Sequence, residues 1–257
     1  MTAHPHESHK GGLSLAAASL RRSFDVYYRD HARTARMDAL NARLVRPGDL
    51  VFDIGAHLGD RTGSFLRIGA RVVAVEPQPR MARALRLLYG RRADFALCEA
   101  AVGEVPGRET LYLNARNPTV ATNSSAFVAA AANAPGWRDQ VWDGRVEVEV
   151  VTLDTLIAAH GTPAFVKIDV EGREDAALAG LSCALPALSF EMTTIQREVA
   201  VRCLNRLDGL ARYRFNLSLG EEHRLRSPAW LDAPDMMRMI AALPDDANSG
   251  DVIARRV

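Results

Sequence analysis

The chain has 257 residues, of which 48% are hydrophobic and 25% charged, so it can form one large α/β domain or two small ones. A net charge of +1 gives no reason to expect nucleic acid or an anionic membrane as a partner, and no apolar run approaches the roughly 20 residues of a transmembrane helix. Three cysteines without a C-x-x-C pair argue against a structural zinc site and predict a cytoplasmic protein.

Residues 1–46 divide into two parts of different composition. Residues 1–12 are polar and contain three histidines, which predicts a disordered tail more than a metal site. Residues 13–46 show a helical pattern with arginines on the other faces, and they predict an N-terminal helical extension and not an export signal. Pro47 and Gly48 end this pattern, and residues 47–257 are assigned to one α/β domain.

The next stretch has the pattern strand, glycine turn, helix, strand. Residues 50–54 and 71–75 are short apolar runs typical of buried parallel strands, and residues 60–68 have helical spacing between them. Gly55 and Gly59 bracket a tight turn, in which backbone without a Cβ can approach a ligand closely. Ligands of open α/β sheets bind beside such turns, at the carboxyl ends of the strands.

The acidic residues at this edge favour one kind of cofactor. Glu76 follows the second strand, where its carboxylate can accept hydrogen bonds from both hydroxyls of a ribose. Asp53 precedes the turn and would repel a diphosphate but attract an ammonium or sulfonium group. The turn, which also contains Ala56 and His57, lacks the third glycine of a dinucleotide fingerprint. S-adenosylmethionine fits this pattern, whereas a turn aspartate in an ordinary βαβ unit is the structural alternative.

Further elements extend the predicted sheet and its cleft. A helix over residues 80–89 leads to a strand over 95–98, whose end should line the cleft through Glu99 and Ala101. Glu99 either accepts a hydrogen bond from an adenine amino group or is an exposed turn residue. Alternating strands over 108–114 and 145–151 flank residues 115–145, which we interpret as a flap or insertion that faces the substrate.

The last informative stretch places more carboxylates at the same edge. Residues 164–168 form an apolar strand that contains Lys167, and a lysine there needs a carboxylate partner or a cofactor nearby. Asp169 follows this strand, Glu171 and Glu174 begin a helix, and a strand over 188–191 ends at Glu191. Acidic residues in a first helical turn also have a purely structural explanation.

The remaining pattern completes the predicted sheet and its helices. A helix over 194–207 precedes a strand over 213–217, a methionine-rich helix is predicted within 230–243, and the last strand covers 252–254. The methionines of that helix are interpreted as core residues.

Several of these segments together resemble the FkbM family of S-adenosylmethionine-dependent methyltransferases. The matching segments are VFDIGAHLG at 51–59, AVEP at 74–77, AAVG at 100–103, LDTL at 153–156, VKIDVEGRE at 166–174 with the following ALAG, and GDVIAR at 250–255. The resemblance implies a class I methyltransferase, Rossmann-like fold, with a seven-stranded, mostly parallel sheet, an antiparallel last strand and helices on both faces. It also implies O-methylation of hydroxyls on small molecules, natural products or sugars. A nicotinamide-dependent oxidoreductase and a non-catalytic nucleoside-binding protein remain alternatives.

Methyl transfer to a hydroxyl needs a base or a metal ion, because a protonated alcohol is a poor nucleophile. The candidate bases are Asp169, Glu171 and Glu191. His57 is expected to contact the methionine end of the cofactor, and His223 is expected at the surface. Asp169 and Glu191 could instead hold a divalent ion, but the pattern names no third ligand, so no metal site is predicted.

Overall fold

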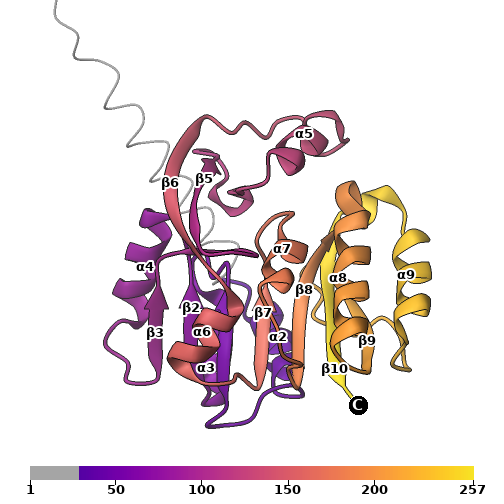
Figure 1. Ribbon diagram of the computed structural model, residues 1–257, viewed down its shortest axis with the longest axis horizontal. Helices are drawn as coiled ribbons and strands as arrows, with labels where there is room; N and C mark the ends of the chain where they lie inside the picture. The colour runs from indigo at the N-terminus through magenta and orange to yellow at the C-terminus, as the bar shows by residue number, and fades with distance from the viewer. Residues whose placement is uncertain (1–28) are drawn as a thin grey trace, which may run out of the picture.

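The computed structural model describes residues 29–257, and a seven-stranded β-sheet forms its centre. The strands are β1 (Leu50–Ile54), β2 (Arg71–Val75), β3 (Phe95–Cys98), β7 (Phe165–Ile168), β8 (Ala187–Thr193), β9 (Tyr213–Leu219) and β10 (Ser249–Arg256). Their order in the sheet is β3-β2-β1-β7-β8-β10-β9, and β10 runs antiparallel to both of its neighbours (Figure 1). This arrangement confirms the predicted class I methyltransferase fold.

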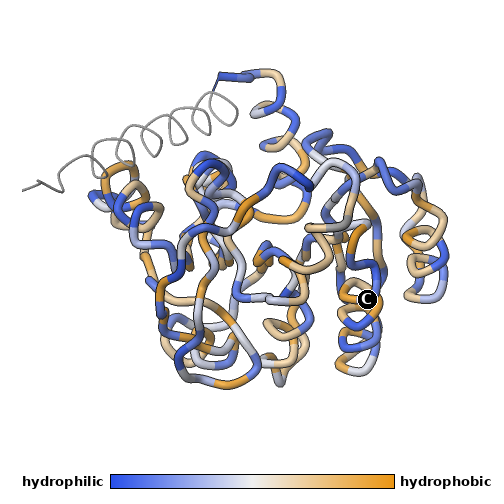
Figure 2. The backbone as a smooth tube through the Cα atoms, turned by 90° about the horizontal axis from the view of Figure 1, so that it is seen from above, coloured by the Kyte–Doolittle hydropathy of each residue, from blue (hydrophilic) through white to orange (hydrophobic). Residues whose placement is uncertain are grey.

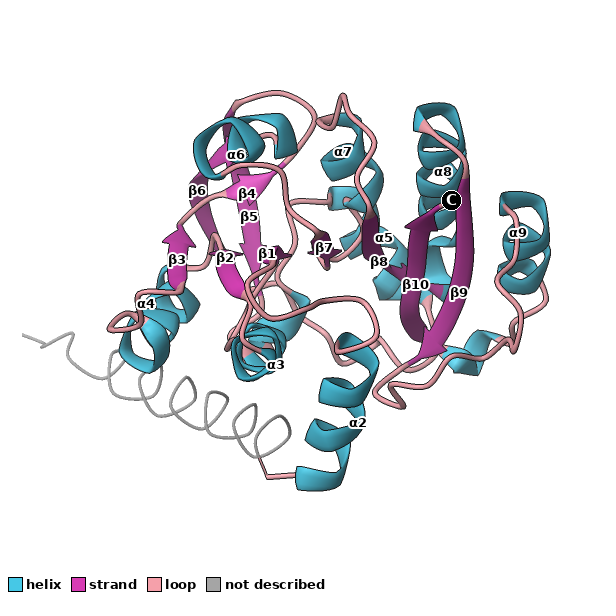
Figure 3. Ribbon diagram, turned by 90° about the horizontal axis from the view of Figure 1, so that it is seen from below, coloured by secondary structure: helices cyan, strands magenta, loops and turns pink. Residues whose placement is uncertain are grey.

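Helices cover both faces of this sheet. They are α2 (His31–Asn41), α3 (Asp60–Ile68), α4 (Pro79–Tyr89), α5 (Ser125–Asn133), α6 (Leu153–His160), α7 (Glu174–Ala179), α8 (Arg197–Leu210) and α9 (Ala233–Ala241). Figure 3 shows α2, α3 and α4 on one side of the strands and α6, α7 and α8 on the other. Helix starts follow side-chain caps, because Asp30, Thr152 and Asp232 each accept a hydrogen bond from the backbone N–H three residues later.

The core forms between the sheet and these helices. Every residue of β1 and β7 is buried, as expected for strands covered on both faces, and Phe52, Val166 and Phe190 belong to the largest apolar cluster. Burial of each such side chain contributes about 1.5–3 kcal/mol to folding. Figure 2 shows polar and apolar residues following one another along the helices, and the buried residues of α8 (Val199, Cys203 and Leu207) are apolar.

A second, three-stranded sheet lies beyond one end of the main strands (Figure 1). It consists of β4 (Ala101–Val102), β5 (Gly107–Leu113) and β6 (Gly144–Val151), in the order β4-β6-β5. The short strand β4 was not predicted, because two residues carry no readable alternation. The connection between β5 and β6 contains a 3₁₀ turn, η1 (Pro118–Val120), and helix α5. Phe127 of α5 packs edge-on against Trp137 and Trp142, so this segment has a small apolar core of its own.

Several predicted boundaries need correction. The predicted tail and the start of the helical extension lie outside the described residues, and α2 is the described part of that extension. Glu191 does not end its strand, because β8 continues to Thr193, which pairs with Ser249 of the longer β10. The 3₁₀ turns η2 (Thr194–Gln196) and η3 (Asp245–Ala247) precede α8 and β10. Among the described helices, none is both long and apolar enough to cross a membrane.

Candidate active site

A cavity opens at the carboxyl ends of β1, β2 and β7, beneath the segment that leads into α5. It encloses about 850 Å³ including its mouth, a volume in the range of small-molecule sites. The predicted residues that line it are Asp53, Gly55, Ala56, His57, Glu76, Ala101, Asp169 and Glu171. Gly59, Glu99 and Glu191 are not part of its lining. The position agrees with the rule that such sheets bind ligands where the strand order reverses, here between β1 and β7.

Glu76 is fixed in the cavity wall by backbone donors. Its Oε2 accepts a hydrogen bond of 2.8 Å from the His57 N–H, and its Oε1 accepts one of 2.8 Å from the Gln78 N–H. The side chain is only 2% exposed, and burial raises the pKa of Glu76 to about 7. A carboxylate has about four lone-pair sites, so about two remain for further donors that enter the cavity.

The glycine turn brings two strands into close contact. A Cβ on Gly55 would lie 1.7 Å from the carbonyl oxygen of Asp169, so only glycine lets the end of β1 approach the end of β7 this closely. Asp53 lies below the turn and accepts a 2.5 Å hydrogen bond from Thr62, and burial raises its pKa to about 6. Burial lowers the pKa of His57 to about 4, so its imidazole is neutral at pH 7.

Lys167 has the carboxylate partners that its position in β7 requires. Its Nζ lies 3.1 Å from Asp169 Oδ2 and 2.7 Å from Asp251 Oδ1, and its side chain is 4% exposed. Burial alone would lower the pKa of Lys167, but these two carboxylates raise it above its ordinary value. Lys167 is therefore a permanent cation that ties the end of β7 to β10.

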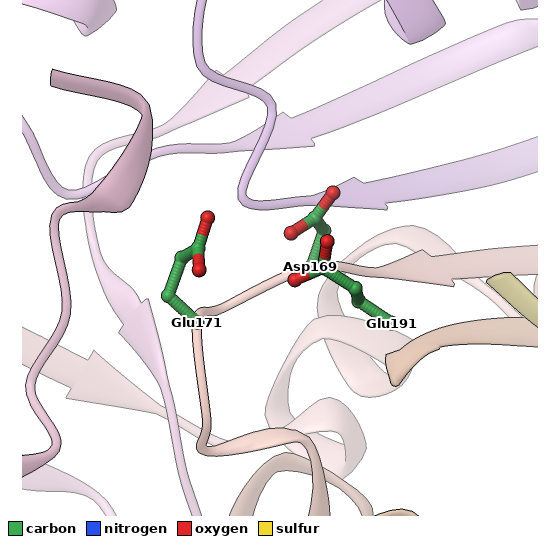
Figure 4. Close-up of side chains that lie close together, drawn as sticks. All are labelled: Asp169, Glu171 and Glu191. Carbon is green, nitrogen blue, oxygen red and sulfur yellow. The ribbon is translucent and has the colours of Figure 1, made fainter. Parts of the chain in front are cut away.

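Asp169, Glu171 and Glu191 form a cluster of carboxylates, in which one oxygen of each residue lies within 4.8 Å of the others. Figure 4 shows that Asp169 and Glu171 come from the loop after β7, whereas Glu191 comes from β8. Burial and mutual repulsion raise the pKa of Glu171 and of Glu191 well above the ordinary range. The cluster thus gathers all three predicted catalytic residues.

The loop that carries Glu171 is held by Glu174. Oε1 of Glu174 accepts a hydrogen bond of 2.9 Å from the Val170 N–H, and its Oε2 accepts one of 3.1 Å from the Gly172 N–H. Glu171 and Gly172 have φ angles of +53° and +89°, a left-handed conformation that is costly for a glutamate. Thr122, from the segment before α5, donates a 2.6 Å hydrogen bond to the Glu171 carbonyl. Within the K-I-D-V-E-G-R-E motif, Glu174 therefore holds the backbone of the loop, whereas the side chain of Glu171 lines the cavity.

We expect Gly172→Ala to lower the free energy of unfolding by about 2–4 kcal/mol. A Cβ at this position would lie 2.7 Å from Phe127 and 2.4 Å from Gln196 Oε1, in addition to the strain of the positive φ. Gly48→Ala is the matched control, because Gly48 has a φ of +87° and open space around a Cβ. Urea unfolding measures the free energy of unfolding of both variants, and the difference between their losses is the cost of the steric clash at Gly172. An equal loss in both variants would show that the clash costs nothing.

Glu99, for which the sequence left two positions open, lies outside the cavity, and His223 lies elsewhere than expected. Glu99 forms an ion pair with Arg86 of α4 at the rim, outside the cavity lining. His223 was expected at the surface, but it is 6% exposed and its Nε2 lies 3.1 Å from Glu221 Oε2. The correction arises because the loop after β9 folds back over the start of α3, which sequence spacing does not reveal.

A network of ion pairs joins α2, the start of α3 and the loop after β9, and the sequence did not predict it. Arg33 of α2 forms ion pairs with Asp60 at 2.8 Å and with Glu221, and Arg61 also pairs with Glu221 at 3.2 Å. Asp60, Arg61 and Glu221 line the cavity. The only sequence signal was the acidic first residue of α3, which the helix dipole explains equally well.

Comparison with models of protein families identifies the family of this chain. The model of the methyltransferase FkbM domain matches residues 53–243, which is most of the chain and includes the glycine turn, Glu76 and the carboxylate cluster. The chain is a member of the FkbM methyltransferase family. It is therefore an S-adenosylmethionine-dependent methyltransferase, and the predicted family resemblance is confirmed.

Solved structures similar to this FkbM protein include other methyltransferases. A TehB-like S-adenosylmethionine-dependent methyltransferase from Corynebacterium glutamicum is 10% identical, with 94% of this chain and 99% of that chain covered and a TM-score of 0.45. Cofactor-bound Rv0187 from MTB is 14% identical, with coverages of 96% and 89% and a TM-score of 0.44. An rRNA methylase from Streptococcus thermophilus is 10% identical, with coverages of 86% and 93% and a TM-score of 0.43. Similarities this low decide nothing about the acceptor. No curated protein matches the sequence significantly.

The cavity fits the cofactor of an FkbM enzyme. Glu76 keeps acceptor sites for two ribose hydroxyls, after its two backbone hydrogen bonds are counted. Ala101 and Leu111 offer an apolar wall for a base, and Asp53 offers a negative charge to a cationic amino acid group. No arginine or lysine from the glycine turn itself, Gly55 to Gly59, is available for a diphosphate.

We expect the affinity for S-adenosylhomocysteine to fall about tenfold between pH 8 and pH 6, because a carboxyl group whose pKa is about 7 gains a proton over this interval. The protonated carboxyl group accepts hydrogen bonds from ribose hydroxyls less well than the carboxylate does. Calorimetric titration at several pH values measures the change. Glu76→Gln should bind more weakly but lose most of this dependence; an unchanged pH profile in Glu76→Gln would assign the effect to another group.

Proposed function

We propose that this FkbM protein transfers a methyl group from S-adenosylmethionine to a hydroxyl group of a small molecule, natural product or sugar. The observation that supports this proposal is the carboxylate cluster beside the cofactor cavity. Asp169 and Glu171 line the cavity itself and offer hydrogen-bond acceptors where an acceptor hydroxyl must lose its proton, and Glu191 lies beside them outside the lining. The net charge of +1 favours a small acceptor over a nucleic acid.

The residues divide the work of the reaction between them. The bound cofactor supplies an electrophilic methyl group on a sulfonium sulfur. Glu76, the glycine turn and Asp53 hold the cofactor, while the Asp169–Glu171–Glu191 cluster orients the acceptor hydroxyl and takes up its proton. Burial and neighbouring negative charges raise the pKa of Glu171 and of Glu191, so these two carboxylates are more basic than in water. Orientation of the two reactants should supply most of the rate enhancement.

The segment between β5 and β6 closes the acceptor side in this proposal. Thr119, Ala121, Thr122 and Asn123 line the cavity from above, and Asn123 and Arg173 both contact Glu109 of β5. These contacts join the segment to the motif loop that carries Glu171. We infer that side chains of this segment select the acceptor and exclude water during transfer.

A labelling experiment tests the proposal. Cells that express the protein are supplied with methionine that carries a ¹³C methyl group, and their metabolites are compared with those of cells that express Asp169→Asn. We expect a labelled metabolite whose carbon shift identifies an O-methyl group, absent with the variant. Label on nitrogen, on carbon or in RNA would overturn O-methylation of a small acceptor while the methyltransferase activity stands.

A further inference from the structure

We propose that Asp169, Glu171 and Glu191 form a binding site for a hard divalent cation such as Mg²⁺, next to the cofactor cavity. The family match assigns no metal to these residues, and the sequence names only two of them as possible ligands. The third, Glu171, joins them because the left-handed backbone of the motif loop turns its side chain toward the cavity.

The spacing of the three carboxylates suits one cation. Their oxygens lie within 4.8 Å of one another (Figure 4). Three oxygens spread evenly around one cation are about 4.0–4.5 Å apart for Ca²⁺ and about 3.5–3.6 Å apart for Mg²⁺. From a spacing of 4.8 Å, the oxygens would have to close by less than about 1 Å to bind Ca²⁺ and by slightly more than about 1 Å to bind Mg²⁺. Carboxylate oxygens are the ligands that these cations prefer.

The cluster lacks the partners that buried carboxylates otherwise have. Within residues 29–257, neither Glu171 nor Glu191 forms a side-chain hydrogen bond or an ion pair with another side chain, although Glu171 is only 8% exposed. Oε2 of Glu191 is completely buried and has no hydrogen-bond donor. A buried carboxyl group without a partner keeps its proton, and a bound metal ion is one partner that would stabilise its charged form.

A fourth oxygen, beside the loop that carries Glu171, has the same deficit. Gln196 is 6% exposed, and its Oε1 is buried without a hydrogen-bond donor. A Cβ built on Gly172 would lie 2.4 Å from this oxygen, so the amide oxygen faces the backbone directly after Glu171. An amide oxygen is also a ligand of hard cations, and Gln196 follows the strand of Glu191 by a single 3₁₀ turn.

Lys167 does not neutralise the cluster. It already bridges Asp169 and Asp251, so one positive charge serves two carboxylates, and Glu171 and Glu191 add two more. A divalent cation would stabilise these carboxylates in their charged form, which the single charge of Lys167 does not. It would also leave coordination positions open toward the cavity, because Mg²⁺ usually keeps several water ligands that a substrate oxygen can replace.

The catalytic use of the cation rests on the proposed function, whereas its binding does not. A hydroxyl that coordinates the cation loses its O–H proton more easily, and a carboxylate oxygen that faces away from the cation accepts this proton. The C–O bond then forms as the C–S bond breaks, the sulfur keeps the bonding electron pair, and S-adenosylhomocysteine is the product. No further reactant is needed.

Binding of Mn²⁺ to the full-length protein after removal of metals with EDTA tests the site. Electron paramagnetic resonance, which measures free Mn²⁺, should show one Mn²⁺ bound per chain and displaced by Mg²⁺ or Ca²⁺. Glu171→Gln and Glu191→Gln should each weaken binding at least about tenfold. Both variants should fold, because removal of one carboxylate from an unpaired cluster relieves repulsion.

Glu76→Gln is the matched control, since it changes a buried carboxylate in the same cavity outside the cluster. It should weaken binding of S-adenosylhomocysteine and leave Mn²⁺ binding unchanged. Glu191→Gln should weaken Mn²⁺ binding and leave binding of S-adenosylhomocysteine unchanged. Absence of bound Mn²⁺ at millimolar concentration, or binding that both cluster variants retain, would overturn the metal site. Methyl transfer that continues in EDTA would remove the catalytic role of the cation and leave the proposed function intact.

Discussion

Replacement of Glu76 by alanine is expected to weaken binding of S-adenosylhomocysteine by about 100-fold or more. The buried carboxylate can accept two hydroxyl donors beside its hydrogen bonds from the His57 and Gln78 N–H groups. A hydrogen bond to a charged acceptor contributes about 1.5–3 kcal/mol, so loss of two costs about 3–6 kcal/mol, and each 1.4 kcal/mol is about tenfold in affinity. Calorimetric titration of the purified variant measures the loss.

Folding must be separated from binding in this experiment. Alanine leaves two buried N–H groups without their acceptor, which costs about 1–3 kcal/mol for each group. The melting temperature of the cofactor-free variant reports this cost, and titration is done well below it. Glu76→Gln keeps one oxygen acceptor and should lie between the wild type and Glu76→Ala in affinity. Wild-type affinity in a folded Glu76→Ala protein would exclude Glu76 from ribose binding.

The sheet could be predicted from the sequence because its strands are short, apolar and buried on both faces. β1 and β7 are recognisable runs, and the carboxyl ends of parallel strands must share one edge. The position of Asp53, Glu76 and Asp169 at the same cavity follows from that rule alone. The need of Lys167 for a carboxylate partner also followed from burial, and the structure supplies two.

Contacts between distant segments could not be predicted in this way. Arg33 and Glu221 are 188 residues apart, and neither belongs to a pattern that names the other. The burial of His223 depends on the same contact, since Glu221 pairs with both residues. These residues carry ordinary surface-type side chains, so composition suggests solvent exposure until the loop after β9 is seen against α2 and α3.

The convergence of Glu171 with Glu191 depended on backbone conformation. A glutamate three residues after a strand is typical of a first helical turn, and α7 begins only at Glu174. The left-handed φ of Glu171 and the two N–H groups held by Glu174 direct the loop toward β8 instead. The sequence signal for this turn was Gly172, whose φ of +89° is unfavourable for other residues.

Lys167→Met is expected to lower the free energy of unfolding by about 3–5 kcal/mol, because it leaves two carboxylates without their cation in a poorly solvated place. Nζ of Lys167 is 2.7 Å from Asp251 and 3.1 Å from Asp169, and the Asp251 side chain is only 16% exposed. Methionine has a similar length, so the change tests the charge and leaves no large cavity. Urea unfolding in EDTA measures the loss without a contribution from bound cations.

A double variant separates the ion pair from packing. In Lys167→Met with Asp251→Asn, the less exposed unpaired carboxylate is also removed, and we expect at least half of the lost stability to return. Asp251→Asn alone should cost less than Lys167→Met, since Lys167 then keeps Asp169. If the double variant were as unstable as Lys167→Met, packing of the lysine stem would explain the loss. Recovery would instead show that β7 tolerates a lysine only because β10 brings a carboxylate to its Nζ.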